Sequence, residues 1–243
     1  MKFRFFLLIT SSFFTILLSA QEKLRIEYEV TPYYESEKKE DIEIVSVSSL
    51  FELISNKNES LYKNIPRISN SQIEPSGNMM ATMSADINPI YKSMDSKTYV
   101  EEAQIGEKLF LIVDDLPKID WKITKETKDI AGFPVLKATT ILDDEYKTKI
   151  EAWYSPKLVY KDGPDKFWGL PGIILEVQTE INYEDGSKEG NKYLATKVEV
   201  LKSNEKIKGL DQGKEITREN FNKIQKKYLQ DQMEMFDGGV DKD

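Results

Sequence analysis

The sequence predicts a mainly β protein, built as a curved antiparallel sheet or half-barrel with one C-terminal α-helix. Apolar and polar residues alternate along most segments after residue 21, which is the period of a half-buried strand. These segments follow one another through short turns without helical patterns between them. That order favours an antiparallel sheet over a parallel sheet of βαβ units.

The strands are predicted in order from this alternation. Residues 24–30 alternate apolar with charged side chains, and residues 42–54 indicate one long strand or two with a bend. Two apolar runs within residues 99–113 are separated by Ile105-Gly106-Glu107. Further strands are expected near residues 121–123, 133–142, 147–154, 173–179 and 193–201.

Turn and helix signals complete the pattern. Asp143-Asp144-Glu145 and Glu184-Asp185-Gly186-Ser187 are predicted hairpin turns, the second because Asp-Gly favours positive φ. Thr217 is a predicted helix cap. The helix then has apolar residues at three- and four-residue steps, which predicts one packed stripe formed by Phe221, Ile224, Tyr228, Leu229 and Met233.

One segment gives no clear pattern. Residues 55–97 are rich in Asn, Ser, Lys and Glu, and no period holds through them. A connection of that length is unusual in a compact domain unless it moves or binds something. No internal repeat and no change of composition divides the chain, so we expect one domain over residues 21–236.

The two ends of the chain are expected to lie outside this domain. Residues 1–20 have a basic start, an apolar stretch and a small-residue cut point at Ser19-Ala20, which is typical of a signal peptide. We therefore expect a periplasmic or secreted protein. The sequence contains no Cys to carry a lipid anchor. Residues 237–243 are expected to form a flexible tail.

Composition excludes several classes of protein. With no Cys and no His, thiolate zinc sites, iron–sulfur clusters and Ser-His-Asp catalysis are excluded. The net charge of −8 opposes binding to nucleic acid and to anionic lipid surfaces. No segment after the signal peptide approaches the length of a transmembrane helix, so stable membrane insertion is not expected.

No catalytic residue, metal ligand or cofactor is predicted. The carboxylate pairs lie in expected turns or strand ends, where the carboxylates would be solvated, and no calcium-binding loop pattern is present. Clustered methionines leave three alternatives open: packing, an adaptable apolar lid over a ligand, or a Cu(I) site. These methionines are Met79, Met80, Met83, Met94, Met233 and Met235.

The most distinctive motif is a glycine- and proline-rich entry to a strand. The glycines can adopt backbone angles that are closed to other residues, and a proline fixes φ between two of them. Neither a Lys-Ser/Thr pair nor a helix pattern follows, so this is not a phosphate-binding loop. The motif residues are Gly163, Pro164, Gly169, Leu170, Pro171, Gly172, Ile173 and Ile174.

This motif resembles the signature of the GLPGLI family, exported proteins of Gram-negative bacteria. The resemblance extends to Trp121-Lys122-Ile123, Ile130-Ala131-Gly132-Phe133, Lys137-Ala138-Thr139 and Ala152-Trp153-Tyr154, in the order and spacing of the family. Here the hexapeptide ends Ile-Ile instead of Leu-Ile. The resemblance implies a curved antiparallel sheet similar to the LolA-like carriers, and no established biochemical activity.

We therefore expect a non-catalytic protein that binds or carries an apolar or peptide-like ligand on the concave face of its sheet. Two alternatives stay open: a structural or partner-binding module of the cell envelope, working through an exposed sheet edge, and the methionine copper site. Aromatic residues around the motif are the candidates for contact with the ligand, and a lysine could anchor an anionic group. The candidate binding residues are Trp153, Tyr154, Phe167, Trp168 and Lys166.

Overall fold

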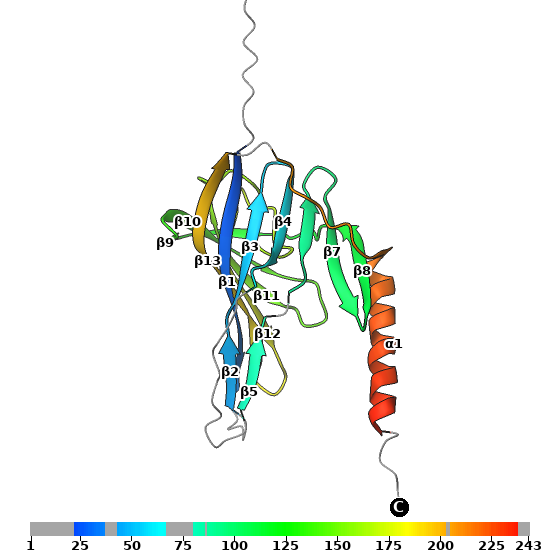
Figure 1. Ribbon diagram of the computed structural model, residues 1–243. Helices are drawn as coiled ribbons and strands as arrows, with labels where there is room; N and C mark the ends of the chain where they lie inside the picture. The colour runs from blue at the N-terminus through cyan, green and yellow to red at the C-terminus, as the bar shows by residue number, and fades with distance from the viewer. Residues whose placement is uncertain (1–21, 37–42, 67–79, 86, 203–204, 238–243) are drawn as a thin grey trace, which may run out of the picture.

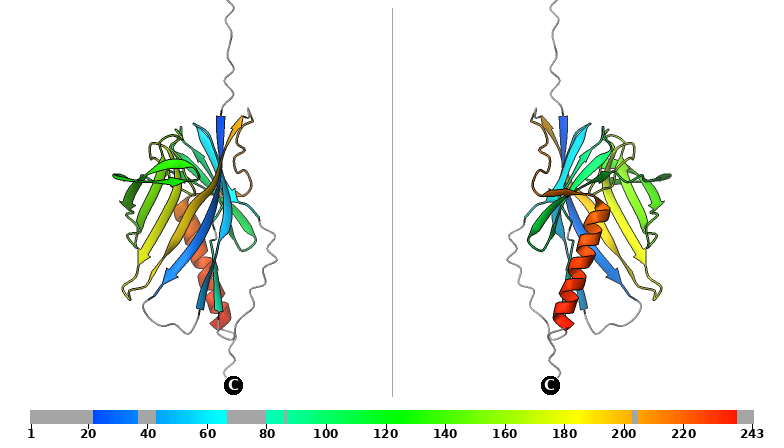
Figure 2. Two further views of the ribbon diagram at one scale, coloured as in Figure 1. Left: turned by 90° about the vertical axis from the view of Figure 1, so that its left-hand side faces the viewer. Right: turned by 90° about the vertical axis from the view of Figure 1, so that its right-hand side faces the viewer.

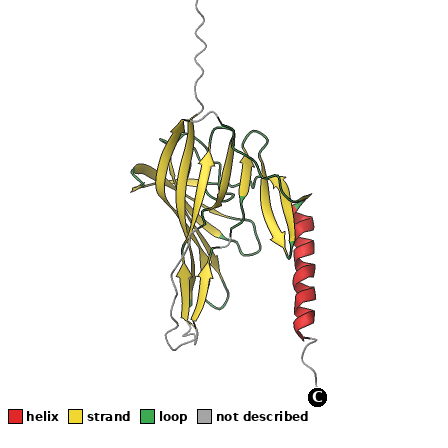
Figure 3. Cartoon of the chain, in the orientation of Figure 1, coloured by secondary structure: helices red, strands yellow, loops and turns green. Residues whose placement is uncertain are grey.

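The computed structural model describes residues 22–36, 43–66, 80–85, 87–202 and 205–237. The predicted signal peptide, residues 1–20, and all of the predicted tail except Asp237 lie outside these ranges. Within them the chain forms strands and one helix, as predicted (Figures 1 and 3). The elements are β1 (Glu22–Glu35), β2 (Glu43–Val47), β3 (Ser49–Ser55), β4 (Glu59–Asn64), β5 (Met80–Ser84), β6 (Ile90–Ser93), β7 (Thr98–Ile105), β8 (Lys108–Asp115), β9 (Lys122–Ile130), β10 (Phe133–Ile141), β11 (Lys149–Ser155), β12 (Ile173–Asn182), β13 (Lys188–Lys202), β14 (Lys214–Ile216) and α1 (Arg218–Asp237).

Twelve of the described strands form one sheet in the order β14-β8-β7-β6-β4-β3-β1-β13-β12-β11-β10-β9. β1 lies in the middle of this order and pairs antiparallel with β3 and with β13. Its alternating sequence explains its place, because every second residue is buried while the residues between them are partly exposed. The buried residues of this strand include Leu24, Ile26, Tyr28 and Val30.

The large sheet is strongly curved. The sheet curves from β8 through β1 to β9, so β8 and β9, near its two ends, lie on opposite sides of β1 and β3 (Figures 1 and 2). The main hydrophobic core combines residues of the central strands with residues of β10–β13 and of the connection between β11 and β12. The curved antiparallel sheet with one C-terminal helix is therefore confirmed.

Two pairs of strands are parallel, which the antiparallel prediction did not include. β14 pairs parallel with β8 at one end of the large sheet, and β2 pairs parallel with β5 in a separate two-stranded sheet. Residues 55–97 contain β4, β5 and β6, although their sequence has no clear period. These strands are only four to six residues long. Such short strands contain too few alternations to stand out from their polar surroundings.

The helix begins as predicted, but most of its apolar stripe is not packed. The hydroxyl of Thr217 accepts a hydrogen bond from the main-chain N–H of Asn220 at 3.3 Å. Phe221 is buried against Phe110 of β8, with the two ring centroids 5.7 Å apart. Beyond this first turn, α1 runs past the end of the β7–β8 hairpin (Figure 1). As a result Leu229 is 50% exposed and Met233 is 67% exposed.

Candidate functional site

The motif segment fills the hollow of the curved sheet, where the sequence suggested an open concave face. The connection between β11 and β12, residues 156–172, is tied to the strands that it joins. The main-chain N–H of Ile173 donates to the carbonyl of Leu158 at 2.9 Å, and that of Ile174 donates to the carbonyl of Asp162 at 2.9 Å. Leu158, Phe167 and Leu170 of this connection belong to the main hydrophobic core.

A buried ion pair fastens this segment to the opposite wall of the sheet. Lys92 of β6 and Asp162 have side chains that are 0% and 1% exposed, and the Lys92 Nζ lies 2.7 Å from the Asp162 Oδ1. The same ammonium donates to the carbonyls of Gly163 at 2.6 Å and Asp165 at 2.8 Å. Ser55 of β3 donates to the Asp162 Oδ2 at 2.7 Å. These contacts fix the position of the motif.

Two motif glycines are required by close packing. A Cβ at Gly172 would lie 2.1 Å from the carbonyl oxygen of Ser155, and a Cβ at Gly163 would lie 2.8 Å from the Ile174 Cβ. Neither position has room for a methyl group. Gly169 differs, because its φ of 95° requires glycine although the nearest atom would be 3.8 Å from its Cβ.

Of the aromatic candidates, Trp153 and Tyr154 are packed into the fold. Trp153 is covered by Lys128, whose Nζ lies 4.1 Å from the ring centroid, and its indole N–H donates to Glu151 at 3.0 Å. Tyr154 is 2% exposed within the main hydrophobic core, where burial raises the pKa of its hydroxyl. Both rings therefore contribute to the packing of the fold.

Trp168 joins the motif to the segment that precedes β9. Its indole N–H donates to the carbonyl of Pro117 at 2.7 Å. In return, the indole N–H of Trp121 donates to the carbonyl of Trp168 at 2.9 Å. The two tryptophans therefore hold residues 117–121 beside the motif.

A cavity of about 400 Å³, here called the signature cavity, lies between the motif and this preceding segment. Phe167 forms one wall, packed edge-to-face on Tyr193 with ring centroids 5.7 Å apart. Lys166 also lines the cavity, so two of the five predicted binding residues are brought together here. The other lining residues are Tyr99, Asp114, Asp115, Pro117, Ile119, Leu142 and Asp165.

Some of the charged side chains around the signature cavity form ion pairs and others do not. Glu101, whose side chain is 7% exposed, accepts hydrogen bonds from Lys166 at 2.9 Å and from Asn88 at 2.9 Å, and it also pairs with Arg218. Burial disfavours the charge on Glu101, but Lys166, Asn88 and Arg218 outweigh burial and lower its pKa from 4.5. By contrast, neither Asp114 nor Asp115 forms an ion pair among the described residues.

We expect this cluster to make stability depend on acidic pH. Because the folded-state pKa of Glu101 is below its ordinary value of 4.5, its contribution is present above that value and decreases as pH falls through the folded pKa. The Glu101→Gln variant should lose about 2 kcal/mol at neutral pH and lose less further stability on acidification than the unmodified chain. Urea unfolding at a series of pH values from neutral down to about pH 3 measures both effects; parallel curves for the two proteins would contradict the role of Glu101.

Two further cavities adjoin the signature cavity. The hexapeptide cavity, of about 390 Å³, lies between residues 119–123 and the motif residues 169–171, and it shares Ile119 with the signature cavity. The polar cavity, of about 730 Å³, lies over the ends of β10, β11 and β12 and shares Asp120 and Lys122 with the hexapeptide cavity. The segment 119–122 therefore contributes at least one residue to each of the three cavities.

Sequence reasoning missed most of this site. The carboxylate pairs were expected only in turns or at strand ends, and one of them, Asp114 and Asp115, does lie at the end of β8. Tyr99, Ile119 and Leu142 are remote from the motif in the sequence, so only the tertiary fold brings them to it. The repeated tryptophans at 121 and 168 were the available signal, because a buried indole N–H requires a partner.

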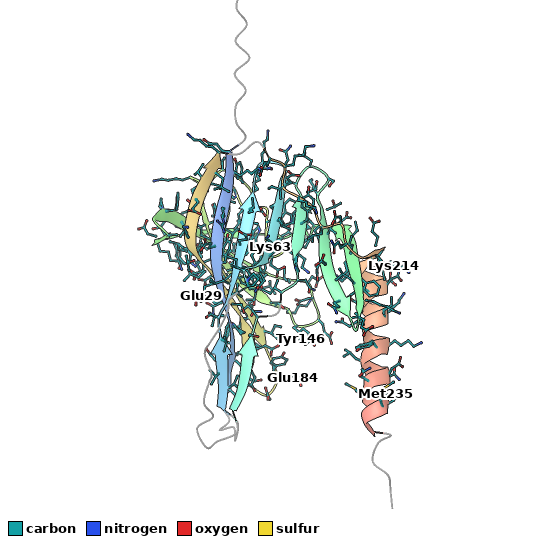
Figure 4. The ribbon with its side chains drawn as sticks, in the orientation of Figure 1. Glu29, Lys63, Tyr146, Glu184, Lys214 and Met235 are labelled. Carbon is teal, nitrogen blue, oxygen red and sulfur yellow. The ribbon has the colours of Figure 1, made fainter. Side chains whose placement is uncertain are left out.

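The described methionines lie in three separate places, with Met233 and Met235 together on α1. Met94 packs with Ile90, Tyr99 and Leu116, whereas Met235 lies toward the free end of α1 (Figure 4). β5, which contains Met83, lies on the other side of the molecule from α1 (Figure 1). Met79 and the side chain of Met80 lie outside the described residues. Over the described ranges, no group of three or more acidic side chains is placed to hold a metal ion.

The comparisons with known proteins point to the motif region and to the fold. A family model described as "Protein of unknown function (Porph_ging)" matches residues 143–176. The matched stretch runs from the β10–β11 turn through the motif into β12. No match was found among curated proteins.

Among solved structures, two crystal forms of PNGF-II have a similar fold. One aligns with a TM-score of 0.53 at 21% identity over 85% of this chain, and the other with a TM-score of 0.56 at 19% identity over 86%. Each alignment covers only about a third of PNGF-II, 33% and 34%. A LolA superfamily protein from Nitrosomonas europaea aligns at a TM-score of 0.28 and 8% identity, over 79% of this chain and 88% of that one, which is too low to relate the two folds.

α1 is the one helix in the described part of the chain, and it is not apolar enough over its length to span a membrane.

Proposed function

We propose that this protein is an exported, non-catalytic binding protein of the GLPGLI family, which holds apolar side chains of a peptide-like ligand in the signature cavity. The observation that carries this proposal is the apolar wall of Phe167, Ile119 and Leu142 beside Asp114 and Asp115, two carboxylates without ion-pair partners among the described residues. Such a wall favours apolar groups, and the carboxylates favour a positive charge beside them. Export rests on the signal-peptide pattern of residues 1–20.

The proposed binding site is the signature cavity and not the concave face of the sheet, which the sequence suggested. The hollow of the sheet is occupied by the chain itself, with Leu170, Ile173 and Ile174 each no more than 1% exposed. A long lipid chain would have to displace this packed segment, whereas the signature cavity is already open at its edge. A ligand that places one or two apolar groups there requires no rearrangement of the core.

Native mass spectrometry of the protein purified from its own cell envelope without detergent tests this function. We expect a co-purifying mass in the range of a peptide. In the Ile119→Ser variant the bound fraction should correspond to about tenfold weaker binding, because an apolar wall of the cavity is lost.

Val159→Ser is the matched control for this experiment. Val159 is also β-branched and apolar, is 76% exposed, and lines none of the cavities described above. This variant should keep the bound mass of the unmodified chain. A bare polypeptide mass for the unmodified chain, or equal losses in the two variants, would contradict binding in the signature cavity.

A partner-binding module of the cell envelope is the second candidate function, and α1 is the feature that favours it. Tyr228, Leu229, Met233 and Met235 are 39% to 72% exposed on this single helix. Exposed apolar residues that gather on one element are typical of an interaction surface. Cross-linking in intact cells through a photoreactive residue at Met233 would capture such a partner.

A further inference from the structure

The segment that precedes β9 has main-chain groups that are not paired with another main chain. Residues 118–121 belong to no strand, and among the described residues their N–H and C=O groups form no hydrogen bond with another main chain. The segment is nevertheless held in place, because Trp168 binds the carbonyl of Pro117 and Trp121 binds the carbonyl of Trp168. It therefore presents a fixed row of donors and acceptors.

This row continues into the free edge of the sheet. β9 is the terminal strand of the large sheet and pairs with β10 alone among the described strands. Its pairing with β10 is interrupted between Ile123 and Thr127, where the main-chain N–H of Glu126 instead bonds to the Thr124 hydroxyl at 3.2 Å. A bulge of this kind prevents regular pairing further along the edge. The usable edge is therefore limited to residues 118–123.

Cavities lie on the two sides of this edge. Residues 119–123 all line the hexapeptide cavity, to which Ile119, Trp121 and Ile123 contribute the apolar side chains, and Ile119 also lines the signature cavity. Asp120 and Lys122 additionally reach the polar cavity, where they face Lys149, Glu151 and Glu180. In a strand added beside this edge, successive side chains would point alternately toward the apolar and the polar side.

We propose that the ligand is an extended polypeptide segment that pairs as an additional strand with residues 118–123. Main-chain hydrogen bonds give the affinity, and cavities for alternate side chains give the sequence preference. Apolar residues enter the signature and hexapeptide cavities, and a lysine of the ligand lies near Asp114 and Asp115. This inference rests on the proposed function and specifies its ligand, since a lipid has no row of amide groups to pair with the edge.

A labelled octapeptide in which leucine alternates with threonine and lysine provides the probe. Fluorescence anisotropy measures its binding to the full chain, and the same is done with two N-methylated versions, one methylated at every leucine and the other at every threonine and lysine. In a strand, the N–H groups of alternate residues point to opposite edges. One version should therefore bind at least about tenfold more weakly than the parent peptide, and the other within about twofold.

Equal affinities of the two methylated peptides would overturn the strand-addition proposal, and so would a parent peptide that does not bind. Neither result would contradict the proposed function if native mass spectrometry still finds an apolar ligand that is lost in the Ile119→Ser variant. A lipid mass that is lost in that variant would retain the signature cavity as a binding site and reject a polypeptide ligand.

Two proline variants test the same pairing from the side of the protein. Ile119→Pro and Asp120→Pro each remove one main-chain N–H from a segment whose N–H groups bond to no other main chain of the described residues, so both variants should fold. Each proline variant is compared with the alanine variant at the same position, because both side chains line the cavities and their loss alone changes binding. Neighbouring N–H groups point in opposite directions, so relative to its alanine counterpart one proline variant should weaken binding of the octapeptide about fivefold and the other should change it little. Equal effects of the two variants would contradict pairing at this edge.

Discussion

The Gly172→Ala variant is expected to lose more than about 4 kcal/mol of unfolding free energy, enough to leave much of the protein unfolded at 37 °C. A Cβ at this position would lie 2.1 Å from the carbonyl oxygen of Ser155 and 3.0 Å from the Pro156 Cα. Both are main-chain atoms, which cannot rotate away as the end of a side chain can. The clash lies where the motif enters β12, beside the pairing of Ser155 with Ile173. A shift of the main chain that removes the clash would therefore separate β12 from β11. Urea unfolding followed by circular dichroism measures the loss.

Gly132→Ala is the matched control for this variant. Alanine is strained at both positions, because φ is 156° at Gly172 and 81° at Gly132, but no atom lies within 4 Å of a Cβ added at Gly132. The control should cost only about 1–2 kcal/mol. Similar losses in the two variants would show that backbone conformation, and not close packing, determines the need for glycine at position 172.

The Lys92→Met variant is expected to lose about 3–5 kcal/mol, because it leaves the Asp162 carboxylate buried without its cation. The ion pair is 0% and 1% exposed, and Lys92 also bonds to two carbonyls of the motif, so the loss combines an uncompensated charge with lost hydrogen bonds. Thermal unfolding by calorimetry is the measurement. The double variant Lys92→Met with Asp162→Leu should recover part of the loss, because no charge is then left buried.

An exposed ion pair provides the comparison. Lys223 and Glu219 on α1 lie 2.7 Å apart, but their side chains are 68% and 78% exposed. The Lys223→Met variant should change stability by less than about 1 kcal/mol. If the Lys92 and Lys223 variants differ little, Lys92 does not fasten the motif segment.

Local patterns were enough to predict most of the individual strands. The alternation in residues 24–30 follows directly from burial of one face. In the Asp-Gly turn before β13, Gly186 has the expected positive φ of 90°, whereas Asp185 does not have a positive φ. The prediction that the apolar stripe of α1 is packed was wrong for most of the helix, because packing depends on tertiary contacts that a local pattern does not contain. Its three- and four-residue period shows that a face is apolar but does not show that another element covers it.

The site was much less accessible to sequence reasoning. Lys166 and Phe167 were identified because they lie inside the motif, but the residues opposite them come from β7, from the end of β8 and from the β10–β11 turn. Trp153 and Tyr154 were chosen as aromatic neighbours of the motif, yet strand register places them within the packed fold. Which face an aromatic residue occupies depends on a register that a single sequence does not specify.

The central place of β1 has a consequence for how the protein reaches its folded state. β1 pairs on one side with β3 and on the other with β13, so Glu22, the first described residue, pairs with Lys202 near the C-terminal end of the sequence. Contacts that join such distant parts of a chain form slowly, because a long loop must close before they stabilise anything. During synthesis the edge of β1 that pairs with β13 stays unpaired until residues 188–202 have been made. A chain that stops before β13 would leave this edge of β1 and the facing edge of β12 unpaired and open to aggregation. Folding of this sheet is therefore completed only after nearly the whole chain has been made.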